Sequence, residues 1–388
     1  MSNGMLKKYY QFELGQVCSR LSSGKGIAAK EISEHGIYPV FGGNGLRGYS
    51  DKKNFEGQCA IIGRQGAFCG NVRFFSGEAY MTEHAVVVCA NEKSDIKYLS
   101  YLLGTMNLGR LSGQSAQPGL SVKTLSKQVI QLPDISEQRQ ITKVLSSFDD
   151  KIELNAQINH NLEEQAKAIF KSWFVDFEPF QNGKFVDSEL GKIPEGWRVL
   201  NFTDVIQILG GGTPKTSQED FWDGDIPFFT PKDVGNSIYV THTEKTLTQA
   251  GIDNCNSKLY PINTVFVTAR GTVGKIALAG VPMAMNQSCY ALVGKNISSF
   301  FILHLTYQTI NRLKNKASGA VFDAIVTRDF DSEQIIFPPT EIIEKFVALV
   351  QNMYEHIRNN ELQQIKLAQM RDTLLPKLMS GEIDVLEV

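Results

Sequence analysis

The sequence predicts an α+β protein with two globular mixed-β domains in tandem repeat, separated by two long antiparallel coiled-coil helices and related by a pseudo-twofold axis. Three observations predict this fold class. The chain has 388 residues, more than a single hydrophobic core usually serves. Its two halves repeat a pattern of short β-branched segments. Each half then ends in a long heptad pattern, which is typical of a coiled-coil helix.

The repeat is marked by matching features at a constant spacing. Residues 112–133 and 318–339 both begin with Ser-Gly and end at a proline, at an offset of 206 residues. The same offset superimposes Arg64 on Arg270. The β-branched segments at corresponding places indicate strands, and they are 60–63, 85–88, 264–268 and 290–293.

The front of each half matches at a different offset. Four apolar positions repeat with a spacing of 188 residues, so the second half holds about 18 extra residues in its first third. Loops that recognise a ligand could differ there. The matched positions are Tyr9, Phe12, Leu14 and Val17 in the first half, and Trp197, Leu200, Phe202 and Val205 in the second.

Each half is followed by residues that step alternately by four and three along the chain, as in a heptad seam. The two seams are displaced by 205 residues, and each predicts a helix of roughly 55–60 Å. The first comprises Ile141, Leu145, Phe148, Ile152, Asn155, Asn159, Leu162, Ala166, Ile169 and Trp173, and the second comprises Phe346, Val350, Met353, Ile357, Asn360, Gln364, Leu367, Arg371, Leu374 and Leu378.

Amide side chains occupy matching seam positions in the two helices. Asn155 corresponds to Asn360, and Asn159 corresponds to Gln364. A buried amide lowers stability but fixes the register of a helix pair, so these four residues are predicted to pair the helices with each other. The alternative is that each seam docks on its own globule.

The expected domain order is globule, helix, linker, globule, helix. The first globule covers 1–133 and its helix 134–178. A linker at 179–190 leads to the second globule, 191–339, and to a C-terminal helix, 340–388.

Charge is distributed unevenly although the net charge is only -2. The first 130 residues carry 15 basic and 9 acidic side chains, whereas residues 131–190 carry 6 basic and 11 acidic ones. Residues 338–388 are also acidic, with 5 basic and 8 acidic side chains. A basic globule suits DNA phosphates, and acidic helices suit a protein partner instead.

The remaining composition is that of an ordinary soluble protein. We expect a cytoplasmic chain, because no apolar run approaches the roughly 20 residues that span a bilayer and the start lacks a signal peptide. The six cysteines form no CxxC pair, so no metal site is expected and the thiols are predicted to be reduced and structural.

The sequence motifs indicate no catalytic residues. Residues 41–45 (FGGNG) fit a glycine pattern of S-adenosylmethionine-binding methyltransferases, but the motif that would hold the target amine is missing. Residues 210–215 (GGGTPK) lack the spacing of a phosphate-binding loop. No nucleophile motif or paired histidine ligands occur.

Loops at strand ends carry side chains that suit DNA. Arginine and glutamine can each make two hydrogen bonds to guanine or adenine edges, although a surface salt bridge is the alternative for any one of them. The candidate DNA-binding residues, chosen by chemistry and loop position, are Asn44, Arg47, Tyr49, Arg64, Gln65, Gln114, Gln117, Thr213, Lys215, Lys232, Arg270, Thr272, Lys275, Asn286 and Gln287.

The first helix ends in an unusually aromatic segment, 169–177. Aromatic side chains anchor protein interfaces, so part of this segment is predicted to bind a partner. The candidate partner-binding residues are Phe170, Trp173, Phe174 and Phe177, with Leu374 and Leu378 near the C-terminus.

The chain contains two distinctive segments, 169–180 (IFKSWFVDFEPF) and 374–383 (LLPKLMSGEI). Five further segments support them, and these are 193–197 (IPEGW), 211–214 (GGTP), 222–227 (WDGDIP), 230–233 (TPKD) and 38–45 (YPVFGGNG). In these segments, and over nearly its whole length, the chain resembles the specificity subunit of type I restriction-modification systems. The segment 38–45 resembles one that the family uses near the start of a target recognition domain.

The resemblance implies a non-catalytic subunit. Each globule would be a target recognition domain that reads one half of an asymmetric bipartite site in double-stranded DNA, and the helices would set the spacer. Two methyltransferase subunits would dock on the helices, and restriction-translocase subunits would complete the complex. S-adenosylmethionine, ATP and magnesium would belong to those partners.

Two other functions remain open at this stage. One is a self-contained DNA methyltransferase or nuclease with its own reader. The other is a coiled-coil scaffold that does not bind DNA.

Overall fold

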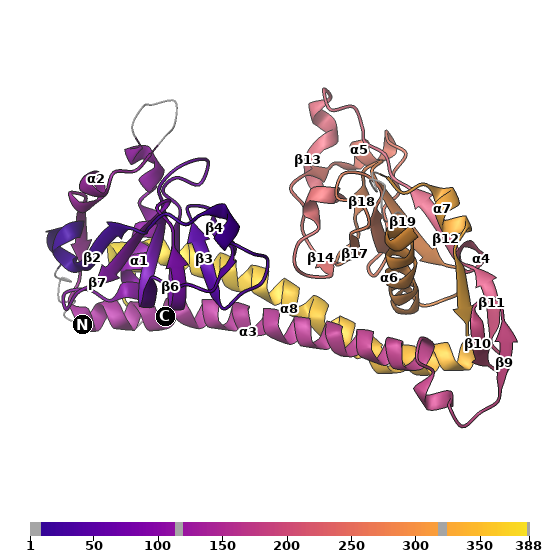
Figure 1. Cartoon of the computed structure of the whole chain (residues 1–388). Coiled ribbons are helices and arrows are strands. Elements are labelled where there is room, and N and C mark those ends of the chain that lie inside the picture. Colours follow the sequence, from indigo (N-terminus) through magenta and orange to yellow (C-terminus); the bar gives the residue numbers. More distant parts are fainter. Residues whose placement is uncertain (1–8, 113–118, 317–323, 386–388) are drawn as a thin grey trace, which may run out of the picture. The chain divides into compact units, whose positions relative to one another are not determined.

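The computed structural model describes residues 9–112, 119–316 and 324–385. The chain divides into two compact units. Unit 1 comprises 1–150 with 367–388, and unit 2 comprises 151–366. Figure 1 labels the longer helices and many of the strands of each unit.

Unit 1 is built on one six-stranded mixed sheet. Strands β3 and β6 pair in parallel, and the other neighbouring strands are antiparallel. Helix α1 (Ile96–Thr105) packs against β5 and β6. In spatial order the strands are β2 (Cys18–Ser23), β7 (Ala85–Ala90), β5 (Phe55–Gly63), β6 (Val72–Met81), β3 (Tyr38–Gly42) and β4 (Gly45–Ser50).

A separate two-stranded ladder pairs a strand at the start of the first globule with a strand at the end of that globule. Strand β1 (Tyr10–Glu13) pairs with β8 (Val129–Leu132), just before the first long helix begins. Short helical segments connect the remaining parts, and these are η1 (Leu14–Val17), η2 (Ala29–Glu31), η3 (Leu108–Leu111) and α2 (Val122–Ser126).

Unit 2 has a five-stranded sheet and a three-stranded sheet, with α6 (Ser299–Lys316) packed on β16 and β19. The five strands are, in order, β12 (Ile206–Gly210), β19 (Cys289–Gly294), β16 (Val265–Thr268), β17 (Ile276–Ala279) and β14 (Tyr239–Val240). The three are β15 (Thr246–Leu247), β13 (Trp222–Phe229) and β18 (Ala284–Met285). Two further pairs are β9 (Phe185–Ser188) with β10 (Gly191–Pro194), and β11 (Arg198–Asn201) with β20 (Gln334–Phe337). The short helices are η4 (Glu178–Phe180), α4 (Phe202–Val205), η5 (Glu219–Phe221), η6 (Pro231–Asp233), α5 (Gln249–Asp253) and α7 (Thr327–Asp331).

The two units share a topology. The order β2-β7-β5 in unit 1 corresponds to β12-β19-β16 in unit 2, and the β1–β8 ladder corresponds to β11–β20. A parallel pair also recurs at an equivalent place, with Phe41 opposite Met81 in unit 1 and Phe229 opposite Met285 in unit 2, and unit 2 has a second parallel pair between β14 and β17. The predicted tandem repeat and the α+β fold class are therefore confirmed.

The apolar positions at the front of each half are core residues. Leu14 and Val17 are fully buried in unit 1, and Phe202 and Val205 are buried in unit 2. In both units a one-turn helix starts with a capping box, in which the side chain at the third helical position accepts a hydrogen bond from the backbone N–H of the capping residue.

Each long helix is continuous and contributes to both units. Helix α3 (Ile135–Phe174) has 40 residues and α8 (Thr340–Ser380) has 41, which corresponds to about 60 Å each. Within unit 2 they run antiparallel, because the Asn155 amide contacts Gln363 while Phe174 contacts Phe346. Within unit 1, Arg371 of α8 forms an ion pair with Asp149 of α3.

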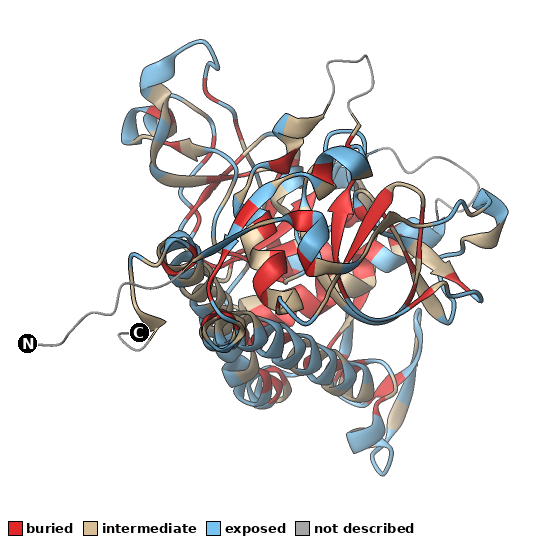
Figure 2. Cartoon of the chain, turned by 90° about the vertical axis from the view of Figure 1, so that its left-hand side faces the viewer, coloured by how far each residue is buried: buried red, intermediate tan, exposed pale blue. Residues whose placement is uncertain are grey.

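The helices also dock on the globules. Helix pairing and docking on a globule, the two alternatives that the heptad seam left open, therefore both occur. In unit 2 the ring of Phe170 stacks on His304 of α6 at 4.9 Å between centroids, and Tyr354 stacks on Phe300 at 5.0 Å. In unit 1, Leu378 is fully buried in the same core as Ile141 and Leu145. Figure 2 shows buried residues on the strands and mostly exposed residues on the outer faces of the long helices.

Within the described residues, no helix is both long and apolar enough to cross a membrane.

Candidate nucleic-acid interface

In unit 1 four loops come together and brace each other through backbone hydrogen bonds. We define loop cluster 1 as 42–47, 63–65, 82–84 and 119–120. The N–H of Arg64 donates to the carbonyl of His84 at 3.0 Å, and the N–H of Leu120 donates to the carbonyl of Arg64 at 2.8 Å. The N–H of Thr82 donates to the carbonyl of Phe41 at 2.9 Å. Side chains from four distant parts of the sequence are thus held together.

The glycines at 42–45 allow this close packing. A Cβ atom at Gly43 would lie 3.1 Å from the carbonyl oxygen of His84, and one at Gly45 would overlap the Arg73 guanidinium. Gly45 also has a φ of 99°, which a side chain would strain. The glycine pattern therefore serves a tight turn between β3 and β4.

Unit 2 has an equivalent set of loops. We define loop cluster 2 as 211–215, 230–233, 269–275 and 286–288. The N–H of Ala269 donates to the carbonyl of Ser288 at 2.8 Å, and the N–H of Asn286 donates to the carbonyl of Phe229 at 2.9 Å. The Thr213 hydroxyl donates to the amide oxygen of Gln287.

The backbone contacts correct the predicted match between Arg64 and Arg270. Gln65 forms an isolated β-bridge with Gly119, and Arg270 forms one with Ala324, at an offset of 205 residues rather than 206. Arg270 is therefore equivalent to Gln65. The position equivalent to Arg64 is Ala269. The N–H of Arg64 donates to His84, just before β7, and the N–H of Ala269 donates to Ser288, just before the equivalent strand β19.

Most predicted DNA-binding side chains lie in these two clusters and are accessible. The exposed ones are Asn44, Arg47, Gln65, Thr213, Lys215, Lys232, Arg270, Thr272, Lys275 and Gln287, while Asn286 is half-buried. Tyr49 is half-buried in β4, where its backbone pairs with Ser33. Gln114 and Gln117 lie outside the described residues.

Arg64 is bonded to loops of its own unit in the structure. Its Nε donates to the carbonyl of Leu120 at 3.3 Å, and its Nη1 donates to the carbonyl of Glu83 at 3.5 Å. The guanidinium is directed at the loops of its own unit and is half-buried. We therefore interpret Arg64 as a brace of loop cluster 1 rather than a reader of bases.

Two residues that contact loop cluster 1 residues, His84 and Arg73, were not among the candidates. The ring nitrogen Nδ1 of His84 lies 3.0 Å from Oε1 of Gln65, and Nε2 lies 3.2 Å from the Glu83 carboxylate. Arg73 reaches the Gly45 turn from β6. An alignment of 82–84 with 286–288, which contains the candidates Asn286 and Gln287, could have found His84. Nothing in the sequence indicates that Arg73 contacts the turn at Gly45.

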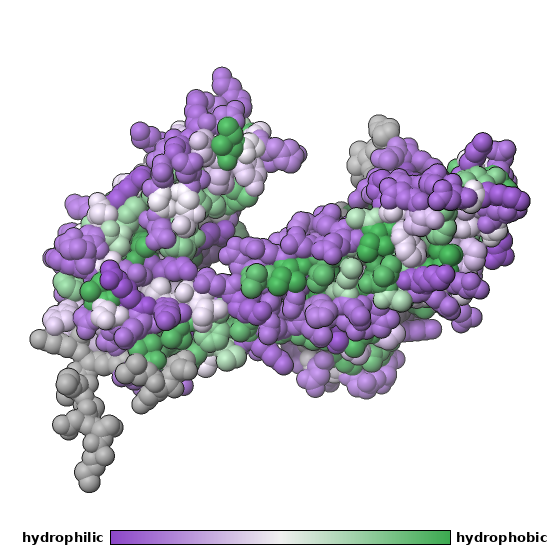
Figure 3. All heavy atoms as spheres, turned by 90° about the horizontal axis from the view of Figure 1, so that it is seen from below, coloured by the Kyte–Doolittle hydropathy of each residue, from purple (hydrophilic) through white to green (hydrophobic). Residues whose placement is uncertain are grey.

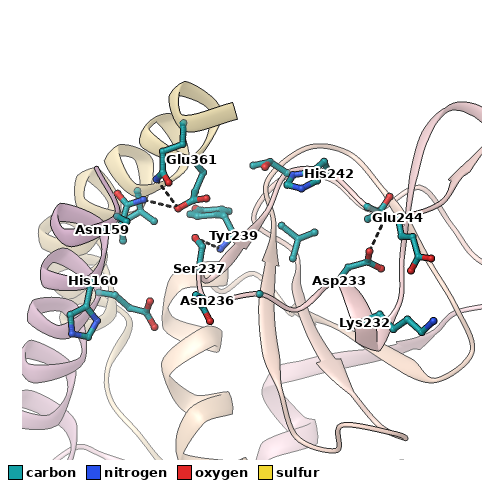
Figure 4. A pocket seen from close by; sticks show the side chains of 18 residues that line it. Asn159, His160, Lys232, Asp233, Asn236, Ser237, Tyr239, His242, Glu244 and Glu361 are labelled. Carbon is teal, nitrogen blue, oxygen red and sulfur yellow. Dashed lines mark hydrogen bonds between the residues drawn. The ribbon is translucent and has the colours of Figure 1, made fainter. Parts of the chain in front are cut away.

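Beside loop cluster 2, a cleft of about 800 Å³ lies between the helix pair and the 232–244 segment of unit 2. Figure 4 shows Asn159 and His160 on the helix side and Asp233 and Glu244 on the opposite side. The carboxylates of Glu163, Glu361, Asp233 and Glu244 line it together with Lys232. This acidic lining is unfavourable for a phosphate backbone, so the exposed cations of loop cluster 2 are better placed to contact DNA.

The helix-pairing amides contact each other or acidic neighbours across the seam. The Asn155 amide donates to Gln363 at 2.7 Å, and the Asn360 amide donates to Asn159 at 2.8 Å. The Asn159 amide in turn donates to Glu361 at 2.8 Å. Gln364 differs, because its amide donates to Glu361 of its own helix at 3.3 Å.

Three of the six thiols are held in the protonated form by burial. Burial raises the pKa of Cys18, Cys59 and Cys289 to about 12, so these thiols stay protonated at neutral pH. Among the described residues, no group of three or more His, Cys, Asp or Glu side chains is placed to hold a metal ion.

Comparison with known proteins now assigns the chain to a family. Residues 7–164 and 194–367 each match the family described as type I restriction modification DNA specificity domain. The chain belongs to this family. The two matches together span most of the sequence, one in each half.

Several specificity proteins are similar in sequence. The type I restriction enzyme MjaIX specificity subunit of Methanocaldococcus jannaschii is 32% identical over 303 residues, covering 75% of this chain and 70% of that protein. The HindI specificity subunit of Haemophilus influenzae is 28% identical, covering 69% of this chain and 71% of that protein. A type I restriction-modification S subunit from M. genitalium has the same fold, with a TM-score of 0.61 at 16% identity over 97% of this chain and 98% of that one.

The aromatic segment 169–177 lies mainly in the hydrophobic core of unit 2. This burial corrects the prediction that the segment forms a partner-binding patch. Phe170, Phe174 and Phe177 are buried in the core of unit 2, where Phe174 contacts Phe301 at 5.1 Å. Trp173 is half-buried against Phe180. Leu378 is buried and Leu374 half-buried in the core of unit 1. These side chains stabilise the units, and among the predicted partner-binding residues the exposed parts of Trp173 and Leu374 remain open to a partner.

Other apolar side chains of the long helices are exposed instead. They are Leu154, Ile158, Leu349 and Met370. Figure 3 shows apolar areas set among polar ones on the face seen from below.

Proposed function

We propose that this chain is the DNA sequence-specificity subunit of a type I restriction-modification complex. Each unit reads one half of a bipartite site in double-stranded DNA. The observation that carries the proposal is the presence of two loop clusters at equivalent places in two units of the same topology, in a chain of this family. Because the side chains of the two clusters differ, the half-sites differ and the site is asymmetric.

The loop clusters have the chemistry that DNA requires. Arg47 in loop cluster 1 and Lys215, Lys232 and Lys275 in loop cluster 2 are exposed. Cations of this kind neutralise phosphates and fix the position of a protein on the duplex. Exposed amides beside them, such as Asn44 and Gln287, can hydrogen-bond to base edges.

The long helices set the length of the unread spacer between the half-sites. Each is one unbroken element that enters the cores of both units, so its length is fixed by its residue count. Their acidic composition disfavours contact with phosphates. Exposed apolar side chains on the same helices, such as Leu154 and Leu349, fit docking by two methyltransferase subunits.

The chemistry belongs to the partners in this proposal. Methyltransferase subunits bring S-adenosylmethionine, and restriction-translocase subunits bring ATP and magnesium. The chain itself is non-catalytic, and the assembled complex acts on DNA in the cytoplasm.

Selection of DNA from a random library tests the proposal. The purified chain is mixed with its methyltransferase subunits, and bound duplexes are sequenced. We expect two different short motifs separated by a fixed number of unspecified base pairs. Recovery of no motif would favour a scaffold that does not bind DNA, and methyl transfer or cleavage by the chain alone would establish a self-contained enzyme.

A further inference from the structure

The two units place different side chains at one equivalent loop position. Gln65 follows β5 and bridges Gly119, and Arg270 follows β16 and bridges Ala324. In both units the preceding residue accepts a hydrogen bond from the incoming segment, at 2.8 Å from Leu120 and at 2.9 Å from Ile325. The backbone is thus the same, and the side chain is what varies.

Both side chains are free to contact a ligand. Gln65 and Arg270 are exposed. Within the part of the chain that the structure describes, the Arg270 guanidinium has no ion pair or side-chain hydrogen bond, in contrast to the bound guanidinium of Arg64. Loop cluster 2 also carries the exposed side chains of Lys232 and Lys275, so its positive charge suits an anionic or strongly accepting partner.

Gln65 contacts a histidine of the same loop cluster through its amide oxygen. Its Oε1 lies 3.0 Å from His84 Nδ1, and the other ring nitrogen lies 3.2 Å from Glu83. This contact fixes the amide at the loop surface, which reduces the entropy lost on binding. Ser288 occupies the place of His84 in unit 2, so Arg270 has no corresponding support.

The two side chains have different hydrogen-bonding patterns. A glutamine amide offers one donor and one acceptor, which match N7 and N6 of adenine in the major groove. A guanidinium offers two parallel donors, which match O6 and N7 of guanine. The position of Gln65 and Arg270 has the same backbone in both units but a different side chain. A substitution there could change which base is recognised without changing the fold.

We propose that this shared position determines one base pair of each half-site, with Gln65 reading an adenine and Arg270 reading a guanine. The inference rests on the proposed function, because it requires that loop clusters 1 and 2 face DNA. His84 is a positioning residue in this assignment.

Reciprocal substitutions test the assignment in the complete complex with methyltransferase subunits. The methylated motif is determined by sequencing the genome of a host that expresses each variant. Gln65→Arg should change one base pair of one half-site from A·T to G·C, and Arg270→Gln should change one base pair of the other half-site in the opposite sense. Matched controls are Gln11→Arg and Arg198→Gln, which lie exposed in the β1–β8 and β11–β20 ladders and should leave the motif unchanged.

Alanine variants cover the case in which a new base is not accepted. Gln65→Ala and Arg270→Ala should each relax preference at one base pair, lowering discrimination on the order of 10- to 100-fold in binding of the purified complex to single-mismatch duplexes. His84→Ala should keep the same preferred base with weaker discrimination. Variants that retain the wild-type preference at every base pair overturn the assignment. If the wild-type complex itself selects no motif, the proposed function fails instead.

Discussion

Replacing Phe170 by alanine distinguishes a core role from a partner-binding role. Its ring is 4% exposed and lies within 6 Å of the rings of Phe174, Phe301, His304 and Phe346, measured between centroids. All these contacts are inside unit 2. Loss of a buried phenylalanine costs about 3–5 kcal/mol of unfolding free energy. With an m-value of about 2–3 kcal/mol/M in urea, the unfolding midpoint should fall by roughly 1–2 M.

Tryptophan fluorescence is a selective assay for this change. The three tryptophans, Trp173, Trp197 and Trp222, all belong to unit 2. Leu154→Ala is the matched control, because this side chain is on the same helix and 48% exposed, and it should change the free energy by about 0.5 kcal/mol or less. An unchanged midpoint for Phe170→Ala, together with lost binding of methyltransferase subunits, would refute the core assignment.

Three further predictions concern the seam, a buried histidine and the basic loops. Asn159→Ala should destabilise unit 2 by about 1–3 kcal/mol, because it removes the acceptor of the Asn360 amide and one of the two donors to Glu361. Asn155→Leu should cost less, because the hydrogen bond that it removes goes to the exposed Gln363, which water can solvate, and because it also removes Oδ1 of Asn155, which is buried without a hydrogen-bond partner among the described residues. Urea unfolding compares the two variants, and equal losses would contradict this. Burial lowers the pKa of His304 from 6.5 to about 3, so the unfolded chain binds a proton at a higher pH than the folded chain does. The stability of unit 2 should therefore fall as the pH drops from about 6.5 toward 3. His304→Gln should weaken this pH dependence in fluorescence-monitored unfolding, and an unaltered pH profile would count against the prediction. Lys275→Ala should weaken DNA binding of the complex equally for all sequences and reduce the slope of log affinity against log salt by about 0.9, while a loss confined to one sequence would point to base reading instead.

Periodic and repeated features of the fold could be predicted from the sequence. The heptad spacing found Ile141, Leu145 and Phe346, all fully buried, because a seam is a local property of the helix. The repeat located the strands for the same reason: both halves place β-branched residues where the central strands pair.

Contacts across the chain were harder to predict. Phe170 and Tyr354 lie off the seam, and their burial depends on α6, which the heptad pattern does not contain. The match of Arg64 to Arg270 was wrong by one residue, since identity of side chains cannot replace the register of backbone hydrogen bonds. This shift of one position matters, because Arg64 is bonded to its own loops whereas Arg270 is exposed.

A paired helix insertion with methylome sequencing tests the central claim most directly. Seven residues that continue the heptad are inserted in α3 after Asp150 and in α8 after Lys366, at the division between the units, so that contacts within each unit are kept. The insertion adds about 10 Å to each helix at 1.5 Å per residue, and one base pair spans about 3.4 Å. The account predicts the same two half-sites with a spacer longer by roughly three base pairs. Altered half-site bases, or an unchanged spacer in a complex that still methylates DNA, would contradict it.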